Sequence, residues 1–150
     1  MGLEIGLMHV RRSIFIEATP GRVWQEFESF ERISAWFGLG HELHTFDAKL
    51  GGQVDLSVEG DDQRSHYGGP IVVFEPGCEV SFESNWEGEN AWPVPTFFTI
   101  RLTPVYDGTL VEIFHHGFER LGAAAGNNLQ GYEEGWGMNH LGALRAIVEG

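Results

Sequence analysis

Seven histidines are the residues of this chain best suited to bind metals or transfer protons. His41 and His44 flank Glu42 and Leu43, which resembles a pair of metal ligands but lacks the His-Glu-x-x-His spacing of helical zinc sites. On a strand, residues three apart point to opposite faces of a sheet. We therefore interpret both as ordinary loop or strand histidines and expect no metal site.

The adjacent pair His115 and His116 ends an alternating apolar segment. Since neighbouring strand residues face opposite sides, one of the two points inward, and the register with Val111 and Ile113 selects His115. We expect His115 to be a hydrogen-bonded histidine of the core or of a cavity. Hydrogen bonding to a ligand and general-base catalysis remain alternatives.

Two further polar side chains, Glu133 and His140, fall on an apolar stripe near the C-terminus. The stripe has helical spacing and comprises Leu129, Glu133, Trp136, His140, Ala143 and Ile147. The helical rise places Glu133 and His140 about 10 Å apart. Buried polar groups need partners, which could be each other through water, His115, or the polar end of a ligand. Alternatively, Glu133 lies near a cavity mouth and is solvated.

Sequence signatures of several enzyme classes are absent. There is no Gly-x-Ser-x-Gly elbow, no phosphate-binding Gly-x-x-x-x-Gly-Lys loop and no pair of cysteines for zinc. We therefore assign no catalytic residue, expect no cofactor, and favour a protein that is not an enzyme. The single cysteine, Cys78, cannot form an internal disulfide, and no signal peptide is visible, so we expect a cytoplasmic protein.

The composition excludes other classes of partner. The net charge of −13 argues against nucleic acid and against anionic membrane surfaces. No apolar run approaches the roughly 20 residues that cross a bilayer. At 150 residues, with 42% hydrophobic and 13% aromatic residues, the chain is predicted to fold as one globular domain over 1–150.

The elements that must position these residues follow from hydrophobic periodicity. A strand over 9–17 precedes two short helices, which begin at the capping pair Thr19-Pro20 and at Ser29, the second running through Phe37. Period-two segments then predict six strands, at 42–47, 52–58, 66–74, 78–86, 96–105 and 109–118, with 119–126 as a loop. A single helix of roughly 30 Å is predicted over about 128–148.

The segments that carry a resemblance occur in order along nearly the whole chain. They are Ile16-Glu17-Ala18-Thr19-Pro20 with Val23-Trp24, Ile33 with Trp36, Gly51-Gly52, Gly69 to Pro76, Gly108-Thr109, Val111 to Phe118, and Gly135-Trp136. In these features the chain resembles the activator of heat-shock-protein-90 ATPase homologue-like family, within the START/Bet v-like (SRPBCC) superfamily. One departure is His140, where the family usually has leucine. Leu141 and Leu144 suggest either a local rotation of the helix or a His140 that points into the cavity.

The resemblance implies an α+β helix-grip fold, a curved antiparallel sheet of about seven strands around a long C-terminal helix. It also implies a cavity for a hydrophobic or amphipathic small molecule between sheet and helix. A chaperone-associated interaction protein and a cofactor-free cyclase or hydrolase are alternatives, and a homodimer is left open. The residues expected to bind the ligand are Trp36, Phe82, Trp86, Phe98, Ile100, Val111, Ile113, His115, Glu133, Trp136 and His140.

Overall fold

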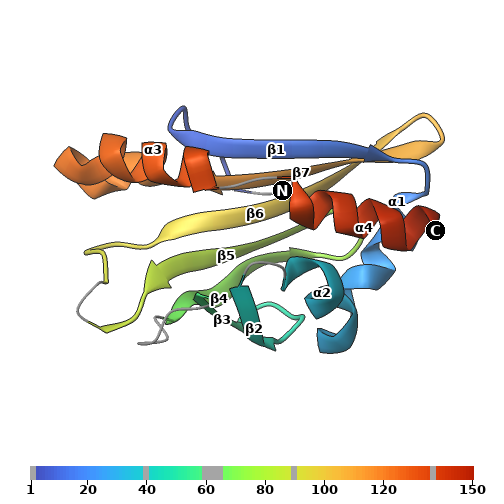
Figure 1. Cartoon of the computed structure of the whole chain (residues 1–150), viewed down its shortest axis with the longest axis horizontal. Helices are drawn as coiled ribbons and strands as arrows, with labels where there is room; N and C mark the ends of the chain where they lie inside the picture. Colours follow the sequence, from blue (N-terminus) through green and yellow to red (C-terminus); the bar gives the residue numbers. More distant parts are fainter. Residues whose placement is uncertain (1–2, 39–40, 59–65, 89–90, 136–137) are drawn as a thin grey trace.

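The computed structural model describes residues 3–38, 41–58, 66–88, 91–135 and 138–150. Of residues 41, 58, 131 and 133–135 only the backbone is described. The described elements are one antiparallel sheet, with helices over one of its faces and at one end (Figure 1). Within the described residues, no helix is both long enough and apolar enough to cross a membrane.

The sheet has seven strands in the order β1-β7-β6-β5-β4-β3-β2, so β1 and β2 form its two edges (Figure 1). The strands are β1 (His9–Ile16), β2 (His41–Phe46), β3 (Gln53–Val58), β4 (His66–Glu75), β5 (Glu79–Trp86), β6 (Thr96–Val105) and β7 (Gly108–His116). Every neighbouring pair is antiparallel. The predicted number of strands and the α+β class are therefore confirmed.

Capping side chains begin the short helices after β1, as the sequence predicts. The Thr19 hydroxyl accepts a hydrogen bond from the Arg22 amide at the start of α1 (Pro20–Trp24), and Ser29 accepts one from the Arg32 amide at the start of α2 (Phe30–Phe37). The short 3₁₀ helix η1 (Gln25–Phe27) lies between them. These helices carry aromatic side chains onto the sheet.

The predicted single C-terminal helix is wrong. The structure has two helices of 11 residues each, α3 (Ala125–Gly135) and α4 (Asn139–Glu149), and the predicted loop 119–126 is largely the 3₁₀ helix η3 (Phe118–Ala124). Gly135 is the last residue of α3, Gly137 follows it in the sequence, and each glycine disfavours helix by about 1 kcal/mol relative to alanine. The two glycines therefore weaken the local preference for helix at this point of the sequence.

Helices α2 and α4 lie over the same face of the sheet, and α3 lies farther along, beside β1 (Figure 1). We call the face under α2 and α4 the inner face. Strand residues alternate between it and the outer face, so Val80 and Phe82 point inward while Glu79 and Ser81 point outward. The main core joins the inner face to α1, α2 and α4.

The N-terminal segment is bonded to the outer face. The Leu3 amide donates to Glu79 Oε2 at 3.2 Å, and the Leu3 carbonyl accepts from the Arg101 guanidinium at 3.0 Å. Arg101 Nε also donates to Glu79 Oε1 at 2.6 Å, so the carboxylate and the guanidinium hold the segment together. Polar outer-face side chains are consequently buried, among them Glu79, Ser81, Thr99 and His116.

Candidate ligand-binding site

Most of the residues that the sequence assigns to a ligand site are buried in the main core. Six of them are at most 4% exposed, namely Trp36, Phe82, Phe98, Ile100, Val111 and Ile113. The rings of Phe82 and Phe98 stack with centroids 5.2 Å apart across the β5–β6 pair. Their inward orientation is confirmed, whereas their contact with a ligand stays a prediction.

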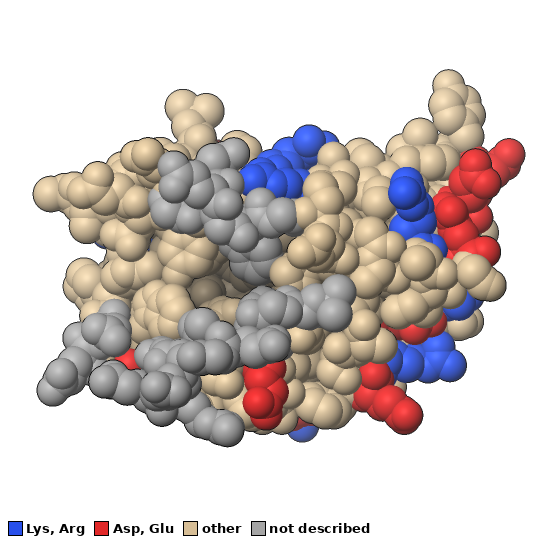
Figure 2. All heavy atoms as spheres, in the orientation of Figure 1, with Lys and Arg blue, Asp and Glu red and all other residues tan. Residues whose placement is uncertain are grey.

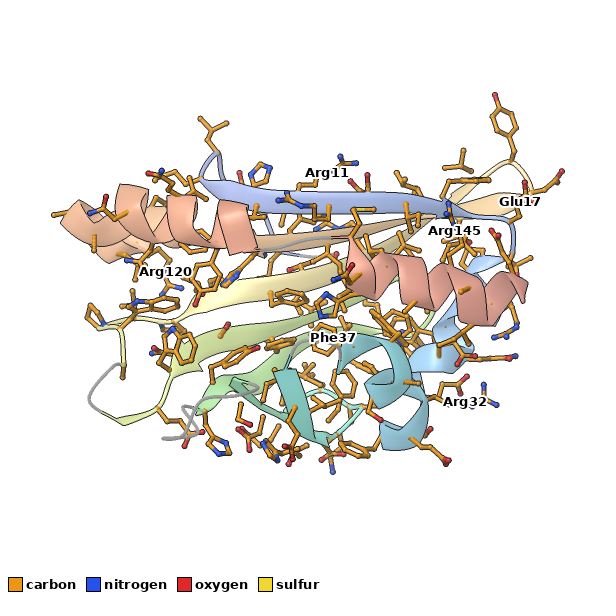
Figure 3. All side chains as sticks on the ribbon, viewed as in Figure 1. Arg11, Glu17, Arg32, Phe37, Arg120 and Arg145 are labelled. Carbon is orange, nitrogen blue, oxygen red and sulfur yellow. The ribbon has the colours of Figure 1, made fainter. Side chains whose placement is uncertain are left out.

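The ring of Phe37, from the end of α2, occupies the middle of the inner face (Figure 3). Its centroid lies 5.4 Å from that of Phe98, 6.5 Å from that of Phe82 and 5.9 Å from that of His140. Phe37 is 1% exposed. The part of the inner face between sheet and α4 is therefore filled by protein side chains.

The sequence left open whether the helix is rotated near His140 or whether His140 points into the cavity. Leu141 and Leu144 are fully buried in the core, so the apolar stripe of α4 is shifted by one residue from the predicted one. His140 is also buried, at 8% exposure, beside Phe37. Ile147, predicted to lie on the buried stripe, is 37% exposed, and this part of the prediction is wrong. Because α4 is a separate helix, its buried face does not continue that of α3.

Two predicted site residues are not placed in detail. Trp136 lies outside the described residues, and Glu133 belongs to α3 but only its backbone is described. Their roles in ligand binding stay predictions.

Beyond Phe37, toward α3, the inner face carries aromatic side chains that are only half-buried. Trp86 at the end of β5 contacts Tyr67 of β4, with ring centroids 4.9 Å apart. The Trp86 indole N–H donates to the Tyr132 hydroxyl of α3 at 3.1 Å. Figure 2 shows that the molecular surface is hollowed on this side of the molecule, left of centre. We call Tyr67, Trp86 and Tyr132 the aromatic rim.

His115 lies directly behind the aromatic rim and is 3% exposed. Its ring centroid is 4.5 Å from that of Tyr132 and 4.8 Å from that of Phe118. Burial, with a smaller contribution from His116, lowers the pKa of His115 to about 3. Its imidazole is therefore uncharged at neutral pH, as expected for a core histidine.

The phenols of the aromatic rim are uncharged as well. Burial raises the pKa of Tyr132 to about 12 despite the hydrogen bond from Trp86, which lowers it. Burial also raises the pKa of Tyr67 above its usual range, and Tyr132 adds to this effect. The hydrogen-bonding groups of Tyr67, Tyr132 and His115 are thus uncharged at neutral pH.

Sequence reasoning missed Tyr67, Phe37 and Tyr132 as site residues. Tyr67 stands four residues before the buried Ile71 on β4, so strand alternation alone places it on the inner face. Tyr132 follows Leu129 by three residues, which places both on one helical face. Phe37 had no comparable signal, because its position over the sheet depends on where α2 ends.

Comparison with known proteins identifies relatives over most of the chain. The family model described as "Activator of Hsp90 ATPase homolog 1-like protein" matches residues 17–149. No curated protein matches the chain.

Solved structures share its fold at low identity. A crystal structure of a Mesorhizobium loti protein has a TM-score of 0.71 at 19% identity, over 94% of this chain and 96% of that one. A solution structure of an Arthrobacter aurescens protein has 0.71 at 18% identity, over 99% and 90%. A solution structure described as the Aha1 dimer from Colwellia psychrerythraea has 0.63 at 14%, over 94% and 96%. At these identities the likeness shows the fold alone.

Proposed function

Because the chain belongs to the Activator of Hsp90 ATPase homolog 1-like family, whose helix-grip fold generally binds small hydrophobic ligands, we propose that it binds such a ligand on its inner face. The observation that carries the proposal is the aromatic rim of Tyr67, Trp86 and Tyr132. These three rings remain half-buried, whereas the neighbouring rings of Phe37, Phe82 and Phe98 are at most 3% exposed.

The rim offers apolar area that the fold itself does not cover. Side chains of Tyr and Trp that are packed on one side and open on the other gain stability when an apolar surface covers them. Small-molecule sites commonly combine such an apolar lining with a few polar groups. The hollow in Figure 2 lies on the same side of the molecule.

The chemistry of the rim selects the class of ligand. Tyr67 and Tyr132 keep their protons at neutral pH, and His115 behind them is uncharged. A neutral hydroxyl can donate and accept hydrogen bonds but cannot balance a formal charge. The ligand that fits is an uncharged aromatic or amphipathic molecule with one or two hydrogen-bonding groups.

The residues predicted from the sequence then divide into two roles. In this proposal Trp86 contacts the ligand directly, and Phe98 and His115 form the protein surface behind the ligand. Deeper members such as Trp36 and Ile100 support that surface from the core. Glu133 and Trp136, on or next to α3, remain proposed members of the ligand-facing set.

The alternative of a cofactor-free enzyme has less support. A general base works best when its pKa lies near the working pH, and the pKa of His115 is about 3. The described ring contacts link His115 to His140 through Phe98 and Phe37.

A chaperone-associated role and a homodimer are further alternatives from the family. One relative of the same fold is described as a dimer. Several large apolar side chains of this chain are exposed, including Phe15 on the edge strand β1 and Phe30 on α2. They belong to different elements and connections of the chain, and single exposed apolar residues are normal. We therefore favour ligand binding.

Titration with the uncharged fluorophore N-phenyl-1-naphthylamine tests this function. We expect saturable binding and displacement by neutral aromatic alcohols. Trp86→Ala should weaken binding about tenfold, the effect of about 1.4 kcal/mol of lost contact. The control is Tyr106→Ala, because Tyr106 is fully exposed in the β6–β7 turn. Fluorescence that does not saturate, or equal binding by Trp86→Ala and wild type, would refute the proposal.

A further inference from the structure

A polar cluster lies on the outer face of the sheet, on the side away from the aromatic rim. Asp55 of β3, His66 at the start of β4 and Glu87 just after β5 form it. Each precedes or follows an inward residue, namely Leu56, Tyr67 and Trp86, so their own side chains share the outer face.

Strand register brings the three residues together. His66 pairs with Ser57 of β3, which places Asp55 two residues further along the same face. The Glu87 amide donates to the His66 carbonyl at 3.0 Å and thereby extends the β4–β5 ladder by one residue. Side chains opposite or diagonal on adjacent antiparallel strands lie within reach of one another.

The distances suit a metal ion. One ligand atom from each of Asp55, His66 and Glu87 lies within 4.8 Å of the others. His66 Nδ1 is 2.9 Å from Asp55 Oδ1 and 3.1 Å from Oδ2. Ions that bind N and O ligands at about 2.1 Å hold adjacent ligand atoms roughly 3.0–3.4 Å apart. Glu87, exposed at the end of its strand, has the freedom to close the remaining distance.

The imidazole of His66 is also held in orientation. The ring of His44 stacks on it with centroids 4.9 Å apart and an angle of 26° between the planes. His44 is itself fixed by its Nε2 contact with Ser57 Oγ at 2.7 Å and by Glu42 Oε2, 3.4 Å from its Nδ1. A register shift in the β2–β3 pairing at this point accommodates His44 as an extra residue.

Charge favours a cation at this position. Asp55 and Glu87 are carboxylates, Glu42 Oε2 lies 3.4 Å from Nδ1 of the His44 ring that stacks on His66, and the whole chain carries a formal charge of −13. One imidazole with two carboxylates is a ligand set for first-row divalent ions such as Zn²⁺ and Co²⁺, whereas Ca²⁺ and Mg²⁺ prefer oxygen alone.

We propose that Asp55, His66 and Glu87 bind a divalent transition-metal ion, with Zn²⁺ as the first candidate, on the outer face of the sheet. The ion takes the place of the proton between His66 Nδ1 and Asp55, and water completes its coordination. It links β3, β4 and the end of β5. The site does not correspond to the spacing of His41 and His44, for which the sequence predicted no metal site. Its residues are brought together by strand register and not by local spacing.

Calorimetric titration of the untagged, chelator-treated full chain with Zn²⁺ tests the site, together with the visible absorption of Co²⁺. We expect one Zn²⁺ per chain and Co²⁺ bands in the visible region. Asp55→Asn and Glu87→Gln should each weaken Zn²⁺ binding at least about tenfold, and His66→Ala should abolish the Co²⁺ bands. Saturating Zn²⁺ should raise the melting temperature of wild type.

The control variants are Asp107→Asn, in the β6–β7 turn, and His9→Ala, on β1. They should bind Zn²⁺ as wild type does. Glu87→Gln keeps the test decisive if a strand variant folds poorly, since Glu87 is exposed. Absence of Zn²⁺ binding by wild type, or equal affinity in wild type and Glu87→Gln together with unchanged Co²⁺ bands in His66→Ala, would overturn the proposal.

Discussion

His115 and His116 are adjacent on β7 but lie on opposite faces of the sheet, and each bonds through Nε2 to a threonine of β6. Thr96 donates its own hydrogen to the Ser84 carbonyl, so it accepts from His115. On the outer face Ser81 donates to Glu79, Thr99 therefore donates to Ser81, and His116 donates to Thr99. Both histidines thus carry their proton on Nε2.

This arrangement predicts a loss of stability in acid. Burial first, with smaller charge effects, lowers the pKa of His115 to about 3 and of His116 to about 4, both below the ordinary 6.5 of an unfolded chain. Between these values the unfolded chain binds more protons. The free energy of unfolding should therefore fall as pH falls below about 6.5, by up to about 1.4 kcal/mol per pH unit for each histidine.

Urea unfolding of wild type and His115→Gln at pH 4.5, 5.5 and 7.5 measures this effect. Glutamine keeps an amide N–H donor for Thr96 but does not titrate. The variant should show a shallower pH dependence than wild type below pH 6.5. Comparing slopes cancels the carboxylates common to both proteins. Identical slopes would show that His115 has an ordinary pKa.

Tyr132→Phe should loosen α3 without disturbing the core. The change removes the acceptor of the Trp86 indole N–H and should cost about 1 kcal/mol. Amide hydrogen exchange should rise in α3 and stay unchanged in α4. Tyr106→Phe is the matched control, because its hydroxyl is on a fully exposed side chain. Equal effects in the two variants would contradict the assigned bond.

Glu26→Gln should destabilise the helices after β1 more than Arg22→Gln or Arg32→Gln does. Glu26 is 4% exposed, and its Oε2 accepts from Arg22 at 2.7 Å and from Arg32 at 2.9 Å. Removing this charge weakens both contacts and should cost about 2 kcal/mol in urea unfolding. Arg22→Gln or Arg32→Gln leaves one partner in place and should cost less than about 1 kcal/mol. A reversed order would show that the arginines act independently of Glu26.

Two glycine substitutions should shift stability in opposite directions. At Gly142 in α4 an added Cβ meets nothing within 4 Å, so Gly142→Ala should stabilise by up to about 1 kcal/mol. At Gly68, with φ of +136°, a Cβ would lie 2.1 Å from the Val54 carbonyl oxygen. Gly68→Ala should lower the melting temperature strongly. Thermal unfolding of both variants checks this pair, and a stabilised Gly68→Ala would contradict the close β3–β4 approach.

Local signals made the sheet and the early helices predictable. Alternation gave strands such as 96–105 with the bounds that the structure has, and Thr19 and Ser29 marked helix starts through their hydroxyls. These features depend on neighbours in sequence. The division of the C-terminal helix could not be predicted from these local signals, because apolar residues recur at helical spacing on both sides of it. His140, followed by Leu141 and Leu144, was a sign that the buried face changes.

The candidate sites were less predictable, because both depend on contacts between distant segments. Phe37 fills the middle of the inner face only because α2 ends there, so the open aromatic surface lies nearer α3 than the sequence suggested. Asp55 and His66 are 11 positions apart, and their meeting depends on the β3–β4 register. No motif records such a spacing.

Because α3 and α4 are separate helices, residues of α3 can change in evolution more freely than residues of α4. α4 packs on β1 and α2, and its buried leucines belong to the main core, whereas α3 packs mainly on η3 and β1. Substitutions in α3 should cost local rather than global stability. A lineage can therefore replace residues of α3, which carries Tyr132 of the aromatic rim, while α4 preserves the fold. Change at the proposed site can then proceed without a change of architecture, as is general for functional sites carried on a conserved fold.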